Sequence, residues 1–349
     1  MTTRRFAIKT LCVALMTLAL PSLAQARARA DRPEGKSIAV FVPGIVSGSP
    51  VYEMLVAGVT EAVNEANARG DSVRLTVVEA GTRQADWGTR MTALVAEGNH
   101  GLVVTSNPAM PEIVAPVAER FPNQDFLVLD AWHSGSGRIT TFRYNQREQA
   151  YISGYLAALV SKSGMPHANK DTVIGLVAGQ EYPAMKNVIL PAYIEGARAV
   201  DPAFRADFRV VGNWYDAAKA ADLARAMKRA GCDVIMPIAG GANQGVVAAA
   251  KEDPFYLAWF DDNGYAKAPG LVVSSSVMAQ RRLAREKTAE WIAGTLVRGV
   301  PSTVGLREGY VSFVSDDERY LAAVPREIRA RVDELVSRIA SGALALPVE

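Results

Sequence analysis

Short apolar runs alternate with longer amphipathic stretches along most of the chain. The first run, residues 37–43, is apolar almost throughout, which is typical of a strand covered on both faces of its sheet. The stretch that follows, residues 51–68, has apolar residues at helical spacing and ends before Gly70. Helices of roughly 10–18 residues between short β-rich runs predict βαβ crossovers and therefore a parallel sheet.

The same alternation continues and then restarts near the middle of the chain. In the first half we expect further strands at 73–79, 101–105, 126–130 and 139–142, and helices at 86–97 and 110–120. After a helix at 147–161, we expect strands at 172–178, 208–211, 233–238 and 255–260, and helices at 183–199, 217–229 and 244–251. A last mixed region holds strands at 271–275 and 309–314 and helices at 281–298 and 325–341.

This order predicts two doubly wound α/β lobes, with the chain crossing between them more than once. We assign residues 36–143 with about 268–315 to an N-terminal lobe. Residues 144–267 with about 316–349 form the C-terminal lobe.

The first thirty residues have the pattern of an export signal. Arg4 and Arg5 precede an apolar run at 11–20, and Ala24-Gln25-Ala26 supplies a small-residue cleavage site. A run of about ten residues is too short to span a bilayer as a helix. We therefore expect residues 1–26 to be a signal peptide and the protein to reside in the periplasm. Cys12 lies inside the apolar run, so it does not resemble a lipoprotein acceptor.

The composition excludes several functional classes. The 38 basic and 36 acidic residues nearly balance, which argues against a nucleic-acid binder. Removal of Cys12 with the signal leaves Cys232 alone, so no internal disulfide is expected. His100, His133 and His167 lack the spacing of a metal site. We expect neither a metal nor a cofactor, and this scarcity suits a protein that binds without catalysing.

Polar and aromatic residues gather where the predicted strands end, which is where open α/β sheets bind their ligands. Trp132, Trp214 and Trp259 follow or end three strands, each near an Asp or Asn. Aromatic faces stack on rings, while carboxylates and amides bond hydroxyl and N–H groups. The pattern predicts a small, polar, ring-bearing ligand. The alternative is that these residues only cover sheet ends and cap the next helices.

Residues 145–159 resemble the E-x-x-Y-x-x-G-x-x-A helix of the basic-membrane-protein family. These are periplasmic substrate-binding proteins of ABC transporters, and they include purine-nucleoside binders. Residues 114–130 are similar to the family's helix leading into F-x-x-x-D, and Trp214 opens a W-x-D-x-x-K match. Residues 239–246 and 260–265 resemble its glycine loop and its V-D-x-D-x-Y tip.

The resemblance implies a type I periplasmic-binding-protein fold, in which two parallel-sheet lobes joined by a multi-strand hinge close on the ligand. It places Tyr52 as the first-lobe stacking aromatic and Asp261 as the second-lobe carboxylate, with Asp130 and the 240–241 backbone lining the cleft. The candidate ligand-binding residues are Ser47, Tyr52, Asn107, Asp130, Trp132, Tyr182, Trp214, Gly240, Gly241, Asn243 and Asp261. The implied partners are a nucleoside-like small molecule and an ABC permease in the inner membrane, and we expect a monomer that binds no nucleic acid.

Three positions depart from the family's nucleoside-binding pattern. Residues 46–52 carry no carboxylate, residues 274–279 carry no lysine, and Trp259 stands where a glycine is usual.

Other functions remain open on the sequence alone. A ligand sensor that docks on a membrane receptor would use the same closed lobes. An exported dinucleotide-dependent oxidoreductase would use the glycines at 240–245 with Asp261 about twenty residues on, yet Ala242 replaces the middle glycine. A hydrolase is disfavoured because neither G-x-S-x-G nor H-E-x-x-H occurs and His133 has no partnered nucleophile. We therefore expect a binding protein and no enzyme.

Overall fold

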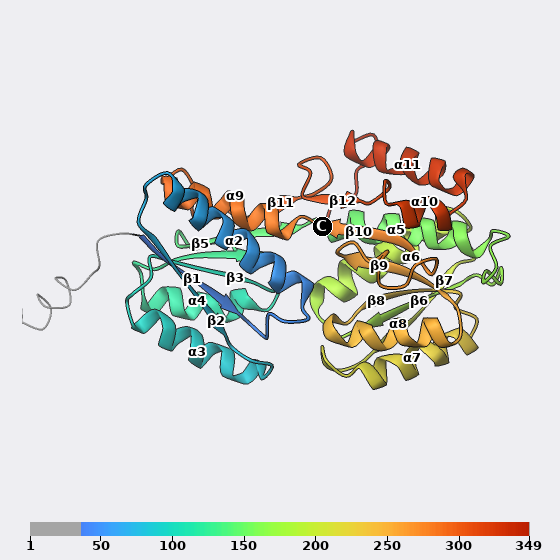
Figure 1. Cartoon of the computed structure of the whole chain (residues 1–349), viewed down its shortest axis with the longest axis horizontal. Coiled ribbons are helices and arrows are strands. Elements are labelled where there is room, and N and C mark those ends of the chain that lie inside the picture. The colour runs from blue at the N-terminus through green and yellow to red at the C-terminus, as the bar shows by residue number, and fades with distance from the viewer. Residues whose placement is uncertain (1–35, 349) are drawn as a thin grey trace, which may run out of the picture. The chain divides into compact units, whose positions relative to one another are not determined.

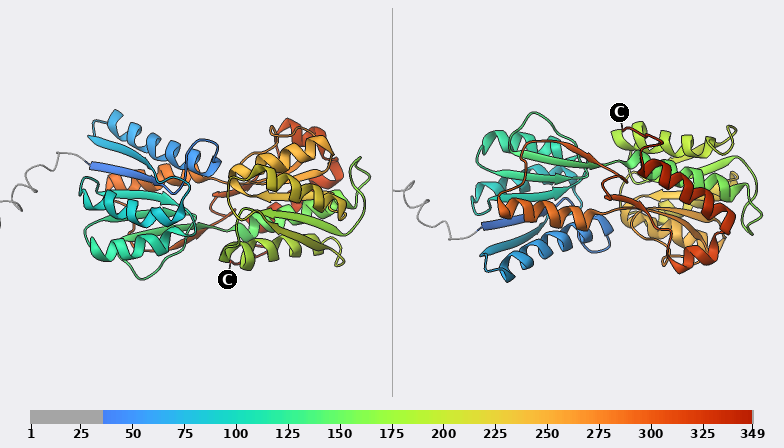
Figure 2. Two further views of the ribbon diagram at one scale, coloured as in Figure 1. Left: turned by 90° about the horizontal axis from the view of Figure 1, so that it is seen from below. Right: turned by 90° about the horizontal axis from the view of Figure 1, so that it is seen from above.

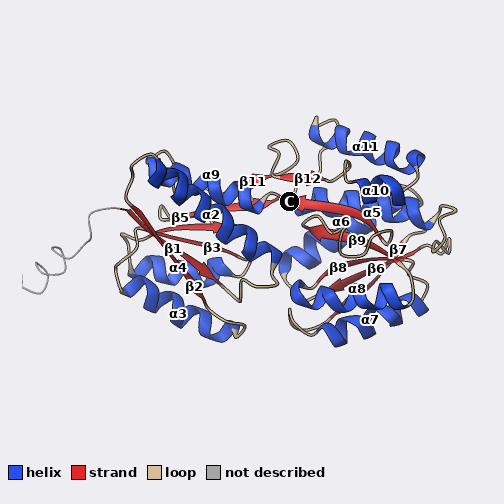
Figure 3. Ribbon diagram, viewed as in Figure 1, coloured by secondary structure: helices blue, strands red, loops and turns tan. Residues whose placement is uncertain are grey.

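The computed structural model describes residues 36–348, whose strands form two six-stranded sheets (Figure 1). The expected signal peptide, residues 1–26, lies outside the described residues. Within residues 36–348, no helix is long and apolar enough to cross a membrane. Helices cover both faces of each sheet, as Figure 3 shows, and this confirms the predicted pair of α/β lobes.

The first sheet has the strand order β11-β5-β4-β3-β1-β2 and is parallel throughout. Its strands are β1 (Lys36–Val42), β2 (Val73–Glu79), β3 (Leu102–Ser106), β4 (Asp125–Leu129), β5 (Ile139–Tyr144) and β11 (Ser302–Val304). Its helices are α2 (Pro50–Ala68), α3 (Gln84–Ala96), α4 (Met110–Arg120) and α9 (Gln280–Ala293).

Strand β1 shows why this run is apolar on both sides. Successive side chains of a strand point to opposite faces. Ile38, Val40 and Val42 pack in the core shared with α2 and α9, whereas Ala39 and Phe41 pack with α3 and α4. All five are fully buried, so a polar residue at any of them would lose its water without gaining a partner.

The second sheet has the order β12-β10-β9-β8-β6-β7, with only β12 antiparallel to its neighbour. Its strands are β6 (Val173–Ala178), β7 (Arg205–Val210), β8 (Val234–Ile238), β9 (Tyr256–Asp261), β10 (Val272–Met278) and β12 (Val311–Phe313). Its helices are α5 (Gln146–Ser161), α6 (Leu190–Arg198), α7 (Ala217–Arg229), α8 (Asn243–Glu252), α10 (Glu318–Ala323) and α11 (Arg326–Ala340). A π-helical turn, η1 (Met185–Ile189), and a 3₁₀ turn, η2 (Gly240–Ala242), precede α6 and α8.

The chain crosses between the lobes three times: from β5 to α5, from β10 to α9, and from β11 to β12 (Figure 2). The sequence assigned residues 268–315 as one block to the first lobe. The strand pairing instead puts β10 and β12 in the second sheet and leaves only α9 and β11 with the first. An apolar run predicts a buried strand, but it does not encode which of two similar sheets the strand joins.

Helices α5 and α6 approach each other through glycine. A Cβ on Gly154 would lie 1.9 Å from the carbonyl oxygen of Tyr193, and one on Gly196 would lie 2.0 Å from that of Tyr151. Both partners are backbone atoms of the facing helix, so neither can move aside cheaply. Glycine at these two positions therefore allows the close approach of α5 and α6.

We expect Gly154→Ala to lower the free energy of unfolding by about 3 kcal/mol, because the added methyl forces two helix backbones apart. Gly88→Ala is the matched control, since Gly88 also lies within a helix and a Cβ there would meet no atom within 4 Å. That variant should gain about 0.5–1 kcal/mol from the higher helix propensity of alanine. Urea unfolding followed by circular dichroism compares the two, and equal effects would contradict the proposed packing constraint.

Candidate functional site

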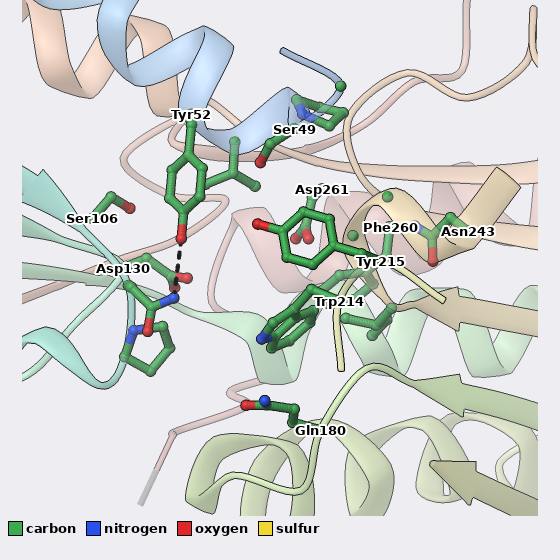
Figure 4. A pocket seen from close by; sticks show the side chains of 18 of the residues that line it. Ser49, Tyr52, Ser106, Asp130, Gln180, Trp214, Tyr215, Asn243, Phe260 and Asp261 are labelled. Carbon is green, nitrogen blue, oxygen red and sulfur yellow. Dashed lines mark hydrogen bonds between the residues drawn. The ribbon is translucent and has the colours of Figure 1, made fainter. Parts of the chain in front are cut away.

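A cleft of about 880 Å³ lies at the carboxyl ends of the strands of both sheets. Parallel strands bring all their carboxyl ends to one edge, so the loops after them meet there. The first lobe contributes the loops after β1, β3 and β4, and the second lobe those after β6, β7, β8 and β9. Figure 4 shows the two sets of side chains facing a common space.

Nine of the expected ligand-binding residues line this cleft, and two do not. The lining residues are Tyr52, Asn107, Asp130, Tyr182, Trp214, Gly240, Gly241, Asn243 and Asp261. Ser47 lies in an exposed turn after β1, outside the lining. Trp132 also lies outside it: its side chain is 41% exposed, and the Arg143 guanidinium lies 4.0 Å from its ring centroid.

The cleft also contains residues that the sequence did not single out. Gln146, Gln180, Tyr215, Phe260 and Met278 line it. Gln180 and Tyr215 are next to residues already recognised at strand ends, so proximity along the chain could have indicated them. Gln146 and Met278 lie at chain crossings, which only the three-dimensional structure reveals.

Tyr52 is fixed by its own lobe. Its Oη donates a hydrogen bond to the Pro43 carbonyl at 3.0 Å and accepts one from Nδ2 of Asn107 at 3.2 Å, drawn as a dashed line in Figure 4. Oδ1 of Asn107 in turn accepts from the Ala109 amide. Because the hydroxyl is already satisfied, Tyr52 offers the cleft mainly its ring face.

Trp214 forms the facing aromatic surface in the second lobe. Its ring lies flat on Gly179, where a Cβ would come within 2.5 Å of it, and Tyr182 packs beside it with ring centroids 6.0 Å apart. The Trp214 carbonyl accepts from the Ala242 amide at 3.0 Å. The ring is thus held in position by backbone contacts with two other loops.

The loop that carries Trp214 also presents Tyr215 across the mouth of the cleft. Oδ1 of Asn213 accepts from the amides of Tyr215 and Asp216, at 2.9 and 2.8 Å, which fixes the turn. The Tyr215 hydroxyl lies against first-lobe Gly44, where a Cβ would be 3.2 Å from it. Glycine at this position therefore allows an aromatic from one lobe to touch the backbone of the other.

Two carboxyl groups lie in the cleft, one from each lobe. Asp130 directly follows β4 and Asp261 ends β9, and these strands occupy equivalent places in their sheets, between β3 and β5 and between β8 and β10. Both residues have left-handed backbone conformations, with φ of 52° and 76°. Non-glycine residues adopt this region at a cost, and such strain concentrates at functional sites.

Among residues 36–348, neither carboxyl has a cationic partner. Within the same residues Asp130 accepts only a hydrogen bond of 3.3 Å from Nε2 of Gln146, and Oδ1 of Asp261 is buried without a hydrogen-bond partner. Burial raises the pKa of Asp130 to about 7. Burial, followed by the nearby charges of Asp130 and Asp262, raises the pKa of Asp261 well above its ordinary value. The pair therefore carries less than its full negative charge at neutral pH.

Trp259 forms part of the wall beside this pair. Its ring packs on Gly264, where a Cβ would lie 2.1 Å away, and its Nε1 donates to Oδ1 of Asp262. Nζ of Lys267 lies 3.3 Å from Oδ2 of Asp262 and 5.0 Å from the Trp259 ring centroid. Lys267 is therefore already engaged within its own lobe, although it lines the cleft.

Comparison with known proteins gives one family and several relatives. The family model described as Bmp, ABC transporter substrate-binding protein PnrA-like, matches residues 35–344. The ABC transporter nucleoside-binding protein BmpA of Lactococcus lactis is 28% identical over 41% of this chain and 38% of its own length. A purine-binding protein of Brucella abortus is 28% identical over 48% of this chain and 45% of its own length.

Among solved structures, a solute-binding protein of an ABC transporter from Aeropyrum pernix superposes with a TM-score of 0.74. It covers 90% of this chain and 94% of its own, at 20% identity. That likeness confirms the predicted periplasmic-binding-protein fold.

The carboxyl pair makes a prediction for stability in the absence of ligand. Between about pH 4 and 7 the folded protein keeps protons on Asp130 that the unfolded chain has released, so this residue's contribution to stability falls as pH rises. The free energy of unfolding of Asp130→Asn minus that of the unsubstituted protein should therefore grow with pH. The slope should be at most about 1.4 kcal/mol per pH unit.

Urea unfolding at intervals between pH 4.5 and 8 measures this difference. Asp71→Asn is the control, because Asp71 is exposed and no described group bonds its carboxylate. That variant is measured over the same pH range as the reference for removing a surface carboxylate. A difference for Asp130→Asn that does not change with pH would show that the Asp130 pKa is not raised by folding.

Proposed function

The chain belongs to the Bmp family of PnrA-like ABC transporter substrate-binding proteins, and we propose that it captures a small, polar, nucleoside-like ligand for an ABC importer. The observation that carries this proposal is the cleft itself. Anchored aromatic side chains from both lobes line it, and carboxyl and amide groups lie around the same space. Such a set of groups binds a ring by its faces and by its polar edge.

Each lobe supplies a different part of the recognition. Tyr52 supports one face of the ring from the first lobe, and Trp214 with Tyr182 supports the other from the second. Asn243 holds the Ala239 amide through Oδ1 at 2.7 Å, which leaves its Nδ2 hydrogens for a ligand acceptor. Asp130 and Asp261 accept hydrogen bonds from ligand hydroxyl or N–H groups.

The size and construction of the cleft suit capture by closure. Its volume of about 880 Å³ is within the range that small-molecule sites occupy. Tyr215 already reaches from one lobe to the backbone of the other at the mouth. A ligand that contacts both lobes stabilises the closed arrangement, because only that arrangement brings both sets of groups to it.

The cellular setting follows from the family and from the N-terminal sequence. We propose that residues 1–26 are removed on export, that the mature protein acts as a monomer in the periplasm, and that it delivers its ligand to a permease in the inner membrane. The names of the nucleoside-binding relative from Lactococcus lactis and the purine-binding relative from Brucella abortus support this choice of ligand class.

Two tryptophans near strand ends provide the test of the ligand site. A purine nucleoside at a hundred times its dissociation constant should raise the free energy of unfolding by about 2.7 kcal/mol, measured by thermal or urea unfolding. Trp214→Ala should weaken binding roughly tenfold, which corresponds to about 1.4 kcal/mol of lost stacking and contact area. Trp132→Ala should bind as the unsubstituted protein does, because Trp132 lies outside the cleft.

The same screen includes free purine bases, sugars and amino acids, and calorimetry supplies the dissociation constants. Stabilisation by sugars or amino acids alone would contradict the nucleoside assignment while leaving a binding protein. A loss of affinity in Trp132→Ala without one in Trp214→Ala would contradict the proposed site.

A further inference from the structure

The charges that line the cleft are unbalanced. Six acidic residues line it, namely Glu53, Glu112, Asp130, Glu181, Asp261 and Asp262. Only two basic residues do so, Lys251 and Lys267, and no arginine among the described residues joins them. The formal difference is four negative charges when all six acids are ionised, and it falls to three because Lys186, outside the lining, pairs with Glu181 at 3.1 Å. A cleft with this balance attracts positive charge and repels anions.

Neither lysine neutralises the carboxyl pair. Lys267 is held by Asp262 at 3.3 Å and by the ring of Trp259. Lys251 lies in the last turn of α8, and neither Asp130 nor Asp261 has it as a hydrogen-bond partner. The only described group bonded to the Asp130 carboxylate is the neutral amide of Gln146.

The buried oxygen of Asp261 is the second and independent sign. A buried carboxylate oxygen normally accepts a hydrogen bond, because losing its hydration without compensation is costly. Oδ1 of Asp261 has no such partner among residues 36–348, although it lies in a cleft lined by donors and rings. Its left-handed backbone holds it there at a further cost.

The surrounding rings favour the same kind of ligand. Tyr52, Tyr182, Trp214 and Tyr215 line the space into which both carboxyls project. The face of an aromatic ring carries partial negative charge and attracts cations, most strongly for tryptophan. Carboxyl groups without cations, enclosed by ring faces, are the combination that recognises an organic cation.

We infer that the cleft is built for a positively charged ring ligand, such as an N-alkylated purine or a pyridinium nucleoside, whose charge lies between Asp130, Asp261 and the aromatic faces. This inference rests on the proposed function, because it specifies the charge of the ligand that the same cleft takes. With a neutral nucleoside bound, the buried pair of Asp130 and Asp261 must keep a proton to lower its negative charge. A bound cation balances that charge directly.

The sign of the pH dependence separates these two cases. Burial raises the pKa of both carboxyls in the free protein, so a cation must displace a proton when it binds at or below neutral pH. Its affinity should therefore rise with pH. The other titratable groups facing the pair are Asp262, held by Lys267, and Tyr52, Tyr144 and Tyr182, whose pKa values burial raises. Glu53, Glu112, Glu181, Tyr215 and Lys251 are the further titratable residues that line the cleft.

Calorimetry on the mature protein between pH 5.5 and 8 tests the inference with paired probes. Nicotinamide riboside carries a pyridinium charge that does not titrate, and inosine is an uncharged nucleoside. The pyridinium cation 1-methylnicotinamide and neutral nicotinamide form the corresponding pair without ribose. We expect each cation to bind at least roughly tenfold more tightly than its neutral counterpart at pH 7.5, and cation affinity to rise by up to about tenfold per pH unit below pH 7.

Asp261→Asn should lower the ratio of cation affinity to neutral-ligand affinity to a value between about 1 and 3. It should also flatten the pH dependence of cation affinity, because one carboxylate no longer titrates. Asp130→Asn provides a second variant should the first fold poorly, and urea unfolding checks both. Asp71→Asn, an exposed carboxylate away from the cleft, should leave the ratio unchanged.

The outcomes separate this inference from the proposed function. Binding of inosine but of neither cation would overturn the inference and leave the nucleoside assignment standing. Binding of 1-methylnicotinamide but of neither nucleoside would support a cation site and contradict the nucleoside assignment. A cation preference that survives both Asp→Asn substitutions would overturn the role given to the carboxyl pair.

Discussion

The shared direction of the strands is the constraint on which the site depends. Because β1, β3 and β4 run parallel in one sheet and β6, β8 and β9 run parallel in the other, the loops that follow these strands emerge at one edge of each sheet. Residues distant in sequence, such as Tyr52 and Asp130, therefore line the same cleft as a consequence of strand direction alone. The same rule acts twice, and it places Asp130 and Asp261 at equivalent ends of β4 and β9.

The crossings between lobes are held by polar contacts at their ends. Oη of Tyr144 donates to Oε1 of Gln280 at 2.7 Å, and Nε2 of Gln280 donates to Oγ of Ser106 at 2.7 Å, which joins two crossings to a strand end beside the cleft. At the third crossing the Glu148 carboxylate accepts from the Leu306 amide at 2.8 Å. All three bonds lie where the chain passes from one lobe to the other, so they tie the ends of the crossings to neighbouring elements.

Hydropathy predicts much of this fold because burial acts on each element locally. Strand β1 is apolar on both faces because helices cover both faces. Its continuous apolar sequence therefore predicts a strand buried on both sides. It does not record which sheet β10 joins, since both sheets offer similar neighbours. Around the cleft, Trp214 follows from its position after a strand, whereas Tyr52 follows from the resemblance to the basic-membrane-protein family. Trp132 has a comparable position, but its loop turns it outward against Arg143, and only tertiary contacts determine that direction.

The cleft groups divide into those already satisfied and those left open, and this division indicates what the ligand must supply. Tyr52, Asn107 and the Trp214 loop are held by hydrogen bonds or close backbone packing within their own lobes, so closing on a ligand costs them little further ordering. Asp261 is the opposite case, because its buried oxygen gains a partner only from outside the described residues. A fold that anchors its rings and leaves a carboxyl unpaired concentrates its selectivity in that carboxyl, since an unsuitable ligand leaves it buried and unsatisfied.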